Sequence, residues 1–81
     1  MKMIAKNKNS VTPLVIETND GLEFEISGEL IKGGYSAYKD SLVLIREGAE
    51  VELTENERDK YTAQILNEFR KEKVSTTFKI S

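Results

Sequence analysis

The chain contains no cysteine, no histidine and no tryptophan, and these absences exclude several kinds of site. Without cysteine there is no disulfide and no thiolate metal ligand, which fits a reducing compartment. Without histidine the chain lacks the commonest general base, the Ser-His and Cys-His nucleophile pairs, and nitrogen-ligated metal sites. We therefore predict that the protein is not an enzyme and that it holds no cofactor or metal.

Long hydrophobic runs are also missing. No apolar stretch approaches the roughly 20 residues that a membrane-spanning helix needs, and the first ten residues lack the apolar core of a signal peptide. A chain of 81 residues is enough for one small domain, which would bury about 60% of the surface that the unfolded chain exposes. We expect a soluble cytoplasmic protein with no membrane partner.

Charge is unevenly distributed, although the formal net charge is only −2. Residues 1–16 carry +3, residues 17–57 carry −8, and residues 58–81 carry +3. The acidic middle of the chain fits either an ordinary solvated surface or a face that binds a basic partner. Because acids accompany the basic residues near the carboxyl terminus, we expect no direct binding to nucleic acid.

Residues 54–73 have the pattern of an amphipathic helix. Thr54 and Glu57 have the spacing of a capping box, which satisfies two backbone amides at a helix start. Apolar residues then recur every four positions, which is typical of a helix with one buried face. These residues are Tyr61, Ile65 and Phe69. The period changes after Lys73, where we place the end of the helix.

A hairpin is predicted on either side of Asn19-Asp20-Gly21. Apolar residues alternate with polar ones at residues 22–27, and an apolar run occupies residues 14–16. A three-residue loop with Gly21 in the left-handed conformation pairs Ile16 with Phe24 and Leu14 with Ile26, so that this apolar set falls on one face, whereas a two-residue loop pairs charge with core. The three-residue loop also places Glu17 opposite Glu23, a mildly destabilising pair of like charges.

The remaining segments are predicted to be short strands. They cover residues 30–31, 35–39, 41–46, 50–53 and 74–80, with a bend at residues 27–29 and a tight turn at Gly33-Gly34. We interpret residues 1–12 as a weakly ordered leader with room for a short strand at Met3 and Ile4, and residues 13–81 as one domain. The predicted fold is α+β: a mainly antiparallel sheet of about five strands, with one long helix packed on one face and a final strand.

Two segments, Ile-Ser-Gly-Glu at residues 26–29 and Gly-Gly-Tyr-Ser-Ala-Tyr-Lys-Asp-Ser-Leu at residues 33–42, carry a family resemblance. They resemble small immunity proteins of bacterial polymorphic toxin systems, including contact-dependent growth inhibition, and the likeness extends loosely over residues 15–80. The resemblance implies a non-enzymatic inhibitor that binds one cognate toxin domain, often a basic nuclease, in the cytoplasm.

The candidate partner-binding residues combine carboxylates with tyrosines. We expect Glu17, Glu23 and Glu25 to form the charged surface, with Glu29, Tyr35, Tyr38 and Asp40 near its rim. Tyr35 and Tyr38 lie three residues apart on a predicted strand, so one tyrosine should be in the core and the other exposed. Tyrosine at an exposed position would contribute strongly to binding a partner.

Two other functions fit the same residues. The first is an acidic inhibitor of phage or plasmid type that mimics nucleic acid. The second is a small structural module that oligomerises through an exposed strand edge.

Overall fold

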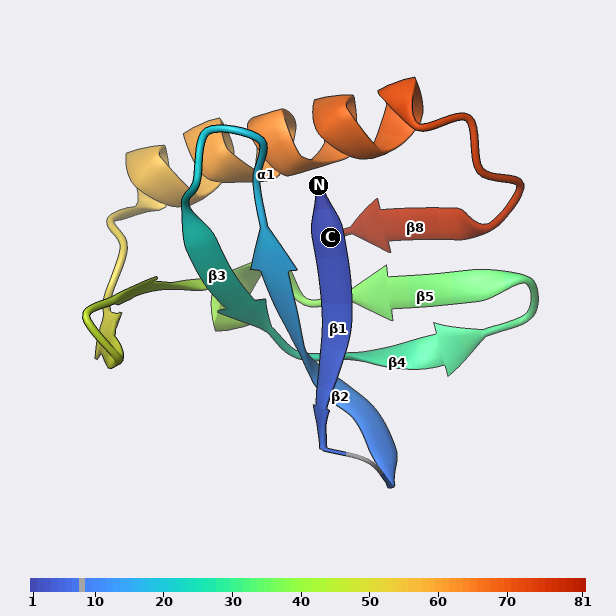
Figure 1. Ribbon diagram of the computed structural model, residues 1–81, viewed down its shortest axis with the longest axis horizontal. Coiled ribbons are helices and arrows are strands. Elements are labelled where there is room, and N and C mark those ends of the chain that lie inside the picture. The colour runs from blue at the N-terminus through green and yellow to red at the C-terminus, as the bar shows by residue number, and fades with distance from the viewer. Residues whose placement is uncertain (8) are drawn as a thin grey trace.

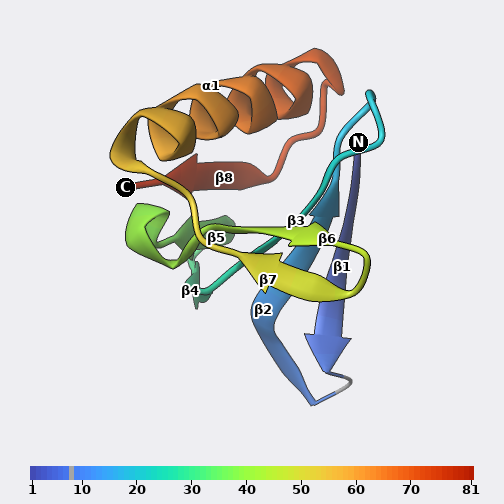
Figure 2. The same cartoon turned by 90° about the vertical axis from the view of Figure 1, so that its left-hand side faces the viewer.

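The computed structural model describes residues 1–7 and 9–81. Within these residues, one helix packs across two β-sheets (Figures 1 and 2). The five-stranded antiparallel sheet has the order β1 (Lys2–Asn7), β2 (Ser10–Glu17), β3 (Glu23–Ile26), β6 (Val43–Arg46) and β7 (Ala49–Val51). The three-stranded sheet has the order β4 (Gly28–Ile31), β5 (Gly34–Ala37) and β8 (Thr77–Ile80). The predicted α+β class is confirmed.

The helix α1 (Glu55–Lys71) begins at the predicted capping box. Thr54 Oγ1 accepts a hydrogen bond from the Glu57 amide at 3.2 Å, and the Glu57 carboxylate accepts one from the Thr54 amide at 2.9 Å. The helix ends two residues earlier than predicted, because Lys73 has a φ of 54° and cannot continue a right-handed helix. In the described residues, no helix has the length and apolar character needed to cross a membrane.

The β2–β3 hairpin has the predicted register. Ile16 pairs with Phe24, and Glu17 pairs with Glu23. Gly21 closes the loop with a φ of 86°, in the left-handed region that favours glycine. Leu14, Ile16, Phe24 and Ile26 therefore lie on one face of the sheet, and Val15 lies on the other face with the carboxylates.

Side chains fix the β2–β3 loop to the helix. Glu68, which is only 9% exposed, accepts a hydrogen bond from the Asn19 amide at 2.8 Å and one from Gln64 Nε2 at 3.1 Å. Gln64 Nε2 also lies 3.2 Å from Asp20 Oδ1, and the Thr18 hydroxyl donates to the same oxygen. The Thr18 hydrogen bond is the main reason that the pKa of Asp20 is lowered. We call this group of hydrogen bonds the loop–helix latch.

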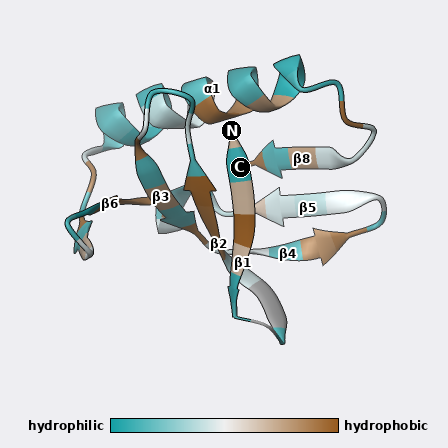
Figure 3. Ribbon diagram, in the orientation of Figure 1, coloured by the Kyte–Doolittle hydropathy of each residue, from teal (hydrophilic) through white to brown (hydrophobic). Residues whose placement is uncertain are grey.

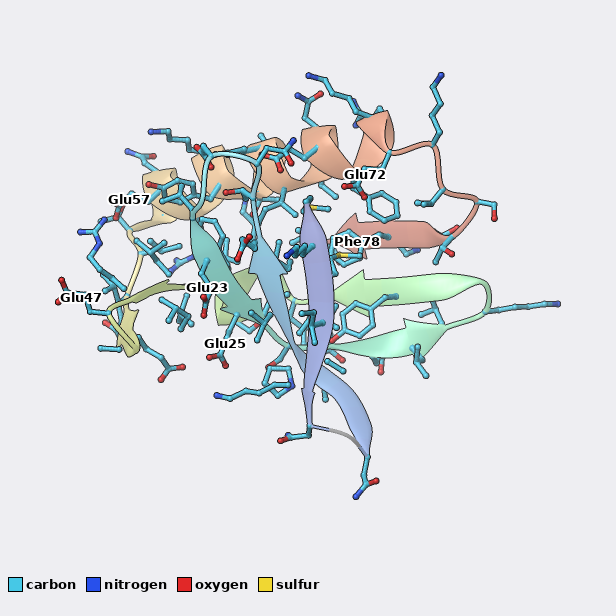
Figure 4. All side chains as sticks on the ribbon, viewed as in Figure 1. Glu23, Glu25, Glu47, Glu57, Glu72 and Phe78 are labelled. Atoms are coloured by element: carbon cyan, nitrogen blue, oxygen red, sulfur yellow. The ribbon has the colours of Figure 1, made fainter. Side chains whose placement is uncertain are left out.

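We expected a leader over residues 1–12, and the structure has strand β1 and the start of strand β2 within this range. Residue 8 lies outside the described residues, but β1 pairs with β2 along most of its length, with Met3 opposite Ile16 and Ala5 opposite Leu14. The amino-terminal ammonium of Met1 lies 2.9 Å from a carboxylate oxygen of Glu72, at the end of the helix (Figure 4). The leader therefore forms the outer strand of the five-stranded sheet.

The second sheet was not expected. The chain bends at Ser27, so β4 leaves the first sheet and pairs with β5. The final strand β8 is shorter than predicted and runs parallel to β5, with Tyr35 opposite Phe78. The two aromatic rings stack at a centroid distance of 6.1 Å. Such a pairing joins residues more than forty positions apart, which sequence periodicity cannot reveal.

The core lies between the helix and both sheets. Phe24 packs on Tyr61 of the helix at a ring distance of 5.0 Å, and Phe69 of the helix packs on Phe78 at 5.3 Å. The largest fully buried side chains are Phe24, Ile16, Ile26, Leu42 and Ile65. One helix thus shields the inner faces of both sheets.

The pairing of β5 with β8 can be tested at two adjacent glycines. A Cβ atom at Gly34 would overlap the Thr77 carbonyl, whereas Gly33 has open space but a φ of 79°. We expect Gly33→Ala to cost about 1–2 kcal/mol of the free energy of unfolding through its backbone conformation. Gly34→Ala should cost about 3 kcal/mol or more, because β8 must move. Urea denaturation measures both costs, and equal costs would contradict the close approach of β8.

Candidate functional site: the outer face of the five-stranded sheet

The five-stranded sheet has one face packed on the helix and one face turned away from it. Phe24 points toward the helix and is fully buried. Its neighbours Glu23 and Glu25 therefore point to the other side, because successive side chains alternate along a strand. Figure 4 shows both glutamates projecting from β3. We call the side turned away from the helix the outer face.

The strand register determines which other residues share the outer face. Directly paired residues lie on the same side of an antiparallel sheet. Two rows of paired residues cross the face: Lys2, Glu17, Glu23, Ile45 and Glu50 in one, and Ile4, Val15, Glu25 and Val43 in the other. Figure 3 shows hydrophobic stretches of β1 and β2 beside hydrophilic stretches of β3. The outer face is therefore apolar and acidic rather than uniformly polar.

The carboxylates of the outer face differ in their partners. Lys6 Nζ lies 3.1 and 3.2 Å from the two carboxylate oxygens of Glu25, whose side chain is only 15% exposed. Glu17 and Glu23 are exposed next to each other, and neither has an ion-pair partner within the described residues. Glu50 is likewise exposed and without a described partner. The available negative charge thus comes from these three residues, and Glu25 is largely balanced by Lys6.

Glu29 and Tyr38 form a second group, on the smaller sheet. Glu29 lies on β4, and Tyr38 follows β5 with a side chain that is 47% exposed. The Glu29 carboxylate is the main reason that the pKa of the Tyr38 hydroxyl is raised above its ordinary value of 10.0. The two side chains are therefore neighbours, and Tyr38 is the exposed tyrosine of the predicted pair.

Tyr35 was expected near the rim of the charged surface, and its position in the structure corrects this. Only 6% of the residue is exposed, because its ring stacks on Phe78 beneath the helix. Its hydroxyl is buried and has no hydrogen-bond partner in the described residues. Tyr35 thus belongs to the core and has too little exposed surface for partner contact.

Asp40 lies in a shallow hollow beside the outer face. It belongs to a short 3-10 helix (Lys39–Ser41) between β5 and β6. The hollow has a volume of ≈ 190 Å³ and is lined by Asp40, Leu42, Val43, Glu52, Leu53 and Arg58. Val43 pairs with Glu25 on the outer face, so the hollow adjoins that face. Asp40 therefore lines a hollow that adjoins the outer face.

Sequence reasoning missed several residues of the site. Lys6 and Ile4 were placed in the leader, and Glu50 was placed at the start of a predicted strand without a neighbouring strand assigned to it. The run Val43 to Ile45 gave no sign of which residues face outward, because it is apolar at every position. If the pairing of β1 with β2 had been predicted, Ile4 would have been identified as an outer-face residue, because it lies opposite Val15.

The chemical groups that the outer face offers are carboxylates and apolar side chains. Within the described part of the chain, no group of three or more acidic side chains could hold a metal ion. The hollow is smaller than the 300–1,000 Å³ typical of small-molecule sites. Comparisons with protein-family models, curated proteins and solved structures gave no match to this chain.

The contact between Glu29 and Tyr38 leads to a pH prediction. Replacing Glu29 by glutamine should lower the pKa of Tyr38 toward 10, because a neutral amide no longer opposes the phenolate. In the wild type, the unfolded chain releases this proton at a lower pH than the folded protein does. The contribution of Tyr38 to stability therefore falls as the pH rises above 10.

Carbon-13 NMR of labelled tyrosine would measure the Tyr38 pKa directly. Glu23→Gln is the matched control, because it removes the same charge from a different sheet and should leave this pKa unchanged. Equal effects of the two substitutions would show that Tyr38 responds to overall charge and not to Glu29.

Proposed function

We propose that the protein is a non-enzymatic immunity protein that binds and neutralises a cognate bacterial toxin domain in the cytoplasm. The observation that supports this most directly is the outer face, where the exposed Ile4 and the half-buried Val15 lie beside Glu17 and Glu23, which have no ion-pair partner in the described residues. The sequence resemblance at residues 26–29 and 33–42 points to the same class of protein. A toxin domain with a basic surface, such as a nuclease, is the partner that this face fits.

The two components of the outer face would serve different parts of the binding process. Glu17, Glu23 and Glu50 would attract and orient a basic partner and so increase the association rate. Ile4, which is 61% exposed, and Val15 would be covered in the complex and slow its dissociation. Such a division of roles is common in tight protein–protein complexes.

The size of the molecule is adequate for this role. A standard protein interface buries about 800 Å² on each partner. The total accessible surface is 5490 Å², so an interface of that size would use about one seventh of it. The molecule measures 31 × 28 × 21 Å, and one of its broader faces can provide this area.

The two alternatives have less support from the outer face. A nucleic-acid mimic needs a continuous row of negative charge, but Lys2 and Lys6 lie at one edge of this face and Ile4 and Val15 interrupt it. An oligomer could form by pairing through the free edge of β1 or β7. Sedimentation would identify this second alternative as a dimer whose population depends on concentration.

The direct test is titration calorimetry against the toxin domain encoded immediately upstream of the gene for this protein, followed by a growth assay with both proteins expressed. We expect nanomolar one-to-one binding and rescue of growth. Absence of both heat and rescue would refute the proposed function and favour the alternatives.

The acidic surface gives a second prediction. Changing Glu17 and Glu23 together to lysine should slow association with that toxin domain at least tenfold at low salt, because the steering charge is reversed. Unfolding should change little, since both side chains are exposed. Stopped-flow fluorescence at several salt concentrations measures the rate.

The matched control is the double variant Glu47→Lys and Glu55→Lys, which makes the same charge change away from the outer face. Glu47 lies in the β6–β7 turn, and Glu55 lies at the start of the helix. Equal slowing by both double variants would mean that net charge, and not the outer face, controls association.

A further inference from the structure

We propose that the hollow beside the outer face receives an arginine side chain of the protein partner. The hollow is lined by Asp40, Leu42, Val43, Glu52, Leu53 and Arg58. This inference rests on the proposed function in one respect, namely that the partner is a basic protein. It adds a particular contact, a chemical identity for the bound group, and two residues that would hold it.

The apolar part of the hollow suits the stem of a long side chain. Leu42 and Leu53 are 1% and 6% exposed and Val43 is half-buried, so the three form a small apolar base, and most of the surface that the hollow exposes is polar. A volume of ≈ 190 Å³ accommodates one large side chain but no drug-sized molecule. Arginine commonly lays its methylene groups along such a surface and keeps its guanidinium at the polar end.

The charges around the hollow favour a cation. Asp40 and Glu52 are exposed, and neither has an ion-pair partner within the described residues. Two basic side chains lie nearby: Arg58 lines the hollow and donates from Nη1 to the Leu53 carbonyl at 2.8 Å, and Lys39 forms an ion pair with Asp59. Two carboxylates against the one guanidinium of Arg58 leave the lining of the hollow with a net charge of −1, which favours a cation.

The shape of the bound group distinguishes arginine from lysine. A guanidinium is planar and has donors along several edges, so it can bond to carboxylates on different sides at once. An ammonium is a compact and strongly hydrated charge that gains less from such a site. Asp40 precedes β6 and Glu52 follows β7, so the carboxylates come from two different segments around the opening.

The position of the hollow connects it to the outer face. Val43 lines the hollow and pairs directly with Glu25 on the neighbouring strand. A partner seated on the outer face could thus place one arginine in the hollow without covering a separate surface. The hollow would then fix the orientation of a partner that the outer-face carboxylates attract.

The test uses N-acetyl-arginine methylamide as the probe, with the citrulline analogue as a neutral control of nearly the same shape. Amide chemical shifts of the nitrogen-15-labelled protein are recorded during titration with each compound. We expect the arginine probe to shift the amides of Asp40, Val43, Glu52 and Arg58 with a millimolar dissociation constant, and the citrulline analogue to bind at least fivefold more weakly. The lysine analogue should also bind more weakly than arginine. Equal shifts from arginine and citrulline, or arginine shifts confined to other residues, would overturn the proposal.

Two substitutions locate the effect. Asp40→Asn and Glu52→Gln should each weaken arginine binding at least threefold, whereas Glu47→Gln removes the same charge outside the hollow and should leave it unchanged. Loss of binding in all three variants would assign the effect to net charge and refute a specific site.

The probe experiment does not involve the toxin domain. Its failure would remove the arginine contact but leave the proposed function, and failure of toxin binding would leave a measured arginine site.

Discussion

The pairing of Ile16 with Phe24 is the constraint on which the rest of the structure depends. Because side chains alternate along a strand, this single register places apolar residues of β2 and β3 under the helix and Glu17, Glu23 and Glu25 on the outer face. A shift by one residue would exchange the two sets. It would put carboxylates against Tyr61 and leave Phe24 in water. The core and the charged surface are thus two consequences of one hairpin.

Polar contacts keep this hairpin in place relative to the helix. In the loop–helix latch, the buried carboxylate of Glu68 accepts hydrogen bonds from the Asn19 amide and from Gln64. A buried carboxylate is costly unless it has such partners, so the loop must stay against the helix for the core to remain favourable. The capping box at Thr54 fixes the other end of the helix. The hairpin that carries Glu17, Glu23 and Glu25 is thus held against the helix, and such preorganisation would lower the entropic cost of the proposed binding.

Local patterns in the sequence were sufficient for the elements whose contacts are local. The capping box, the stripe from Tyr61 to Phe69 and the three-residue loop at Gly21 each depend on residues a few positions apart, and the structure confirms them. Pairings between distant segments could not be predicted this way. The parallel contact between β5 and β8 is one example, and the role of β1 is another, since its alternation of Met3 and Ala5 with polar residues is weak.

In the candidate site too, local contacts could be predicted from the sequence and contacts between distant segments could not. Alternation along β3 correctly placed Glu23 and Glu25 on one face, and the hairpin added Glu17. Burial of Tyr35 depends on stacking against Phe78, and neutralisation of Glu25 depends on Lys6, so both required the structure. The hollow at Asp40 likewise combines distant segments: Asp40 and Leu42 precede β6, Val43 lies in β6, Glu52 and Leu53 precede the helix, and Arg58 lies in the helix.

The central claim is that the outer face contacts the toxin domain. The most direct measurement is NMR cross-saturation transfer, from the unlabelled toxin domain to the deuterated and nitrogen-15-labelled protein in their complex. We expect the strongest loss of signal at amides of β2, β3 and β6 and around Asp40, with the exposed side of the helix unaffected. Signal loss concentrated on the helix, with none on β3, would contradict the assignment of the outer face as the binding surface.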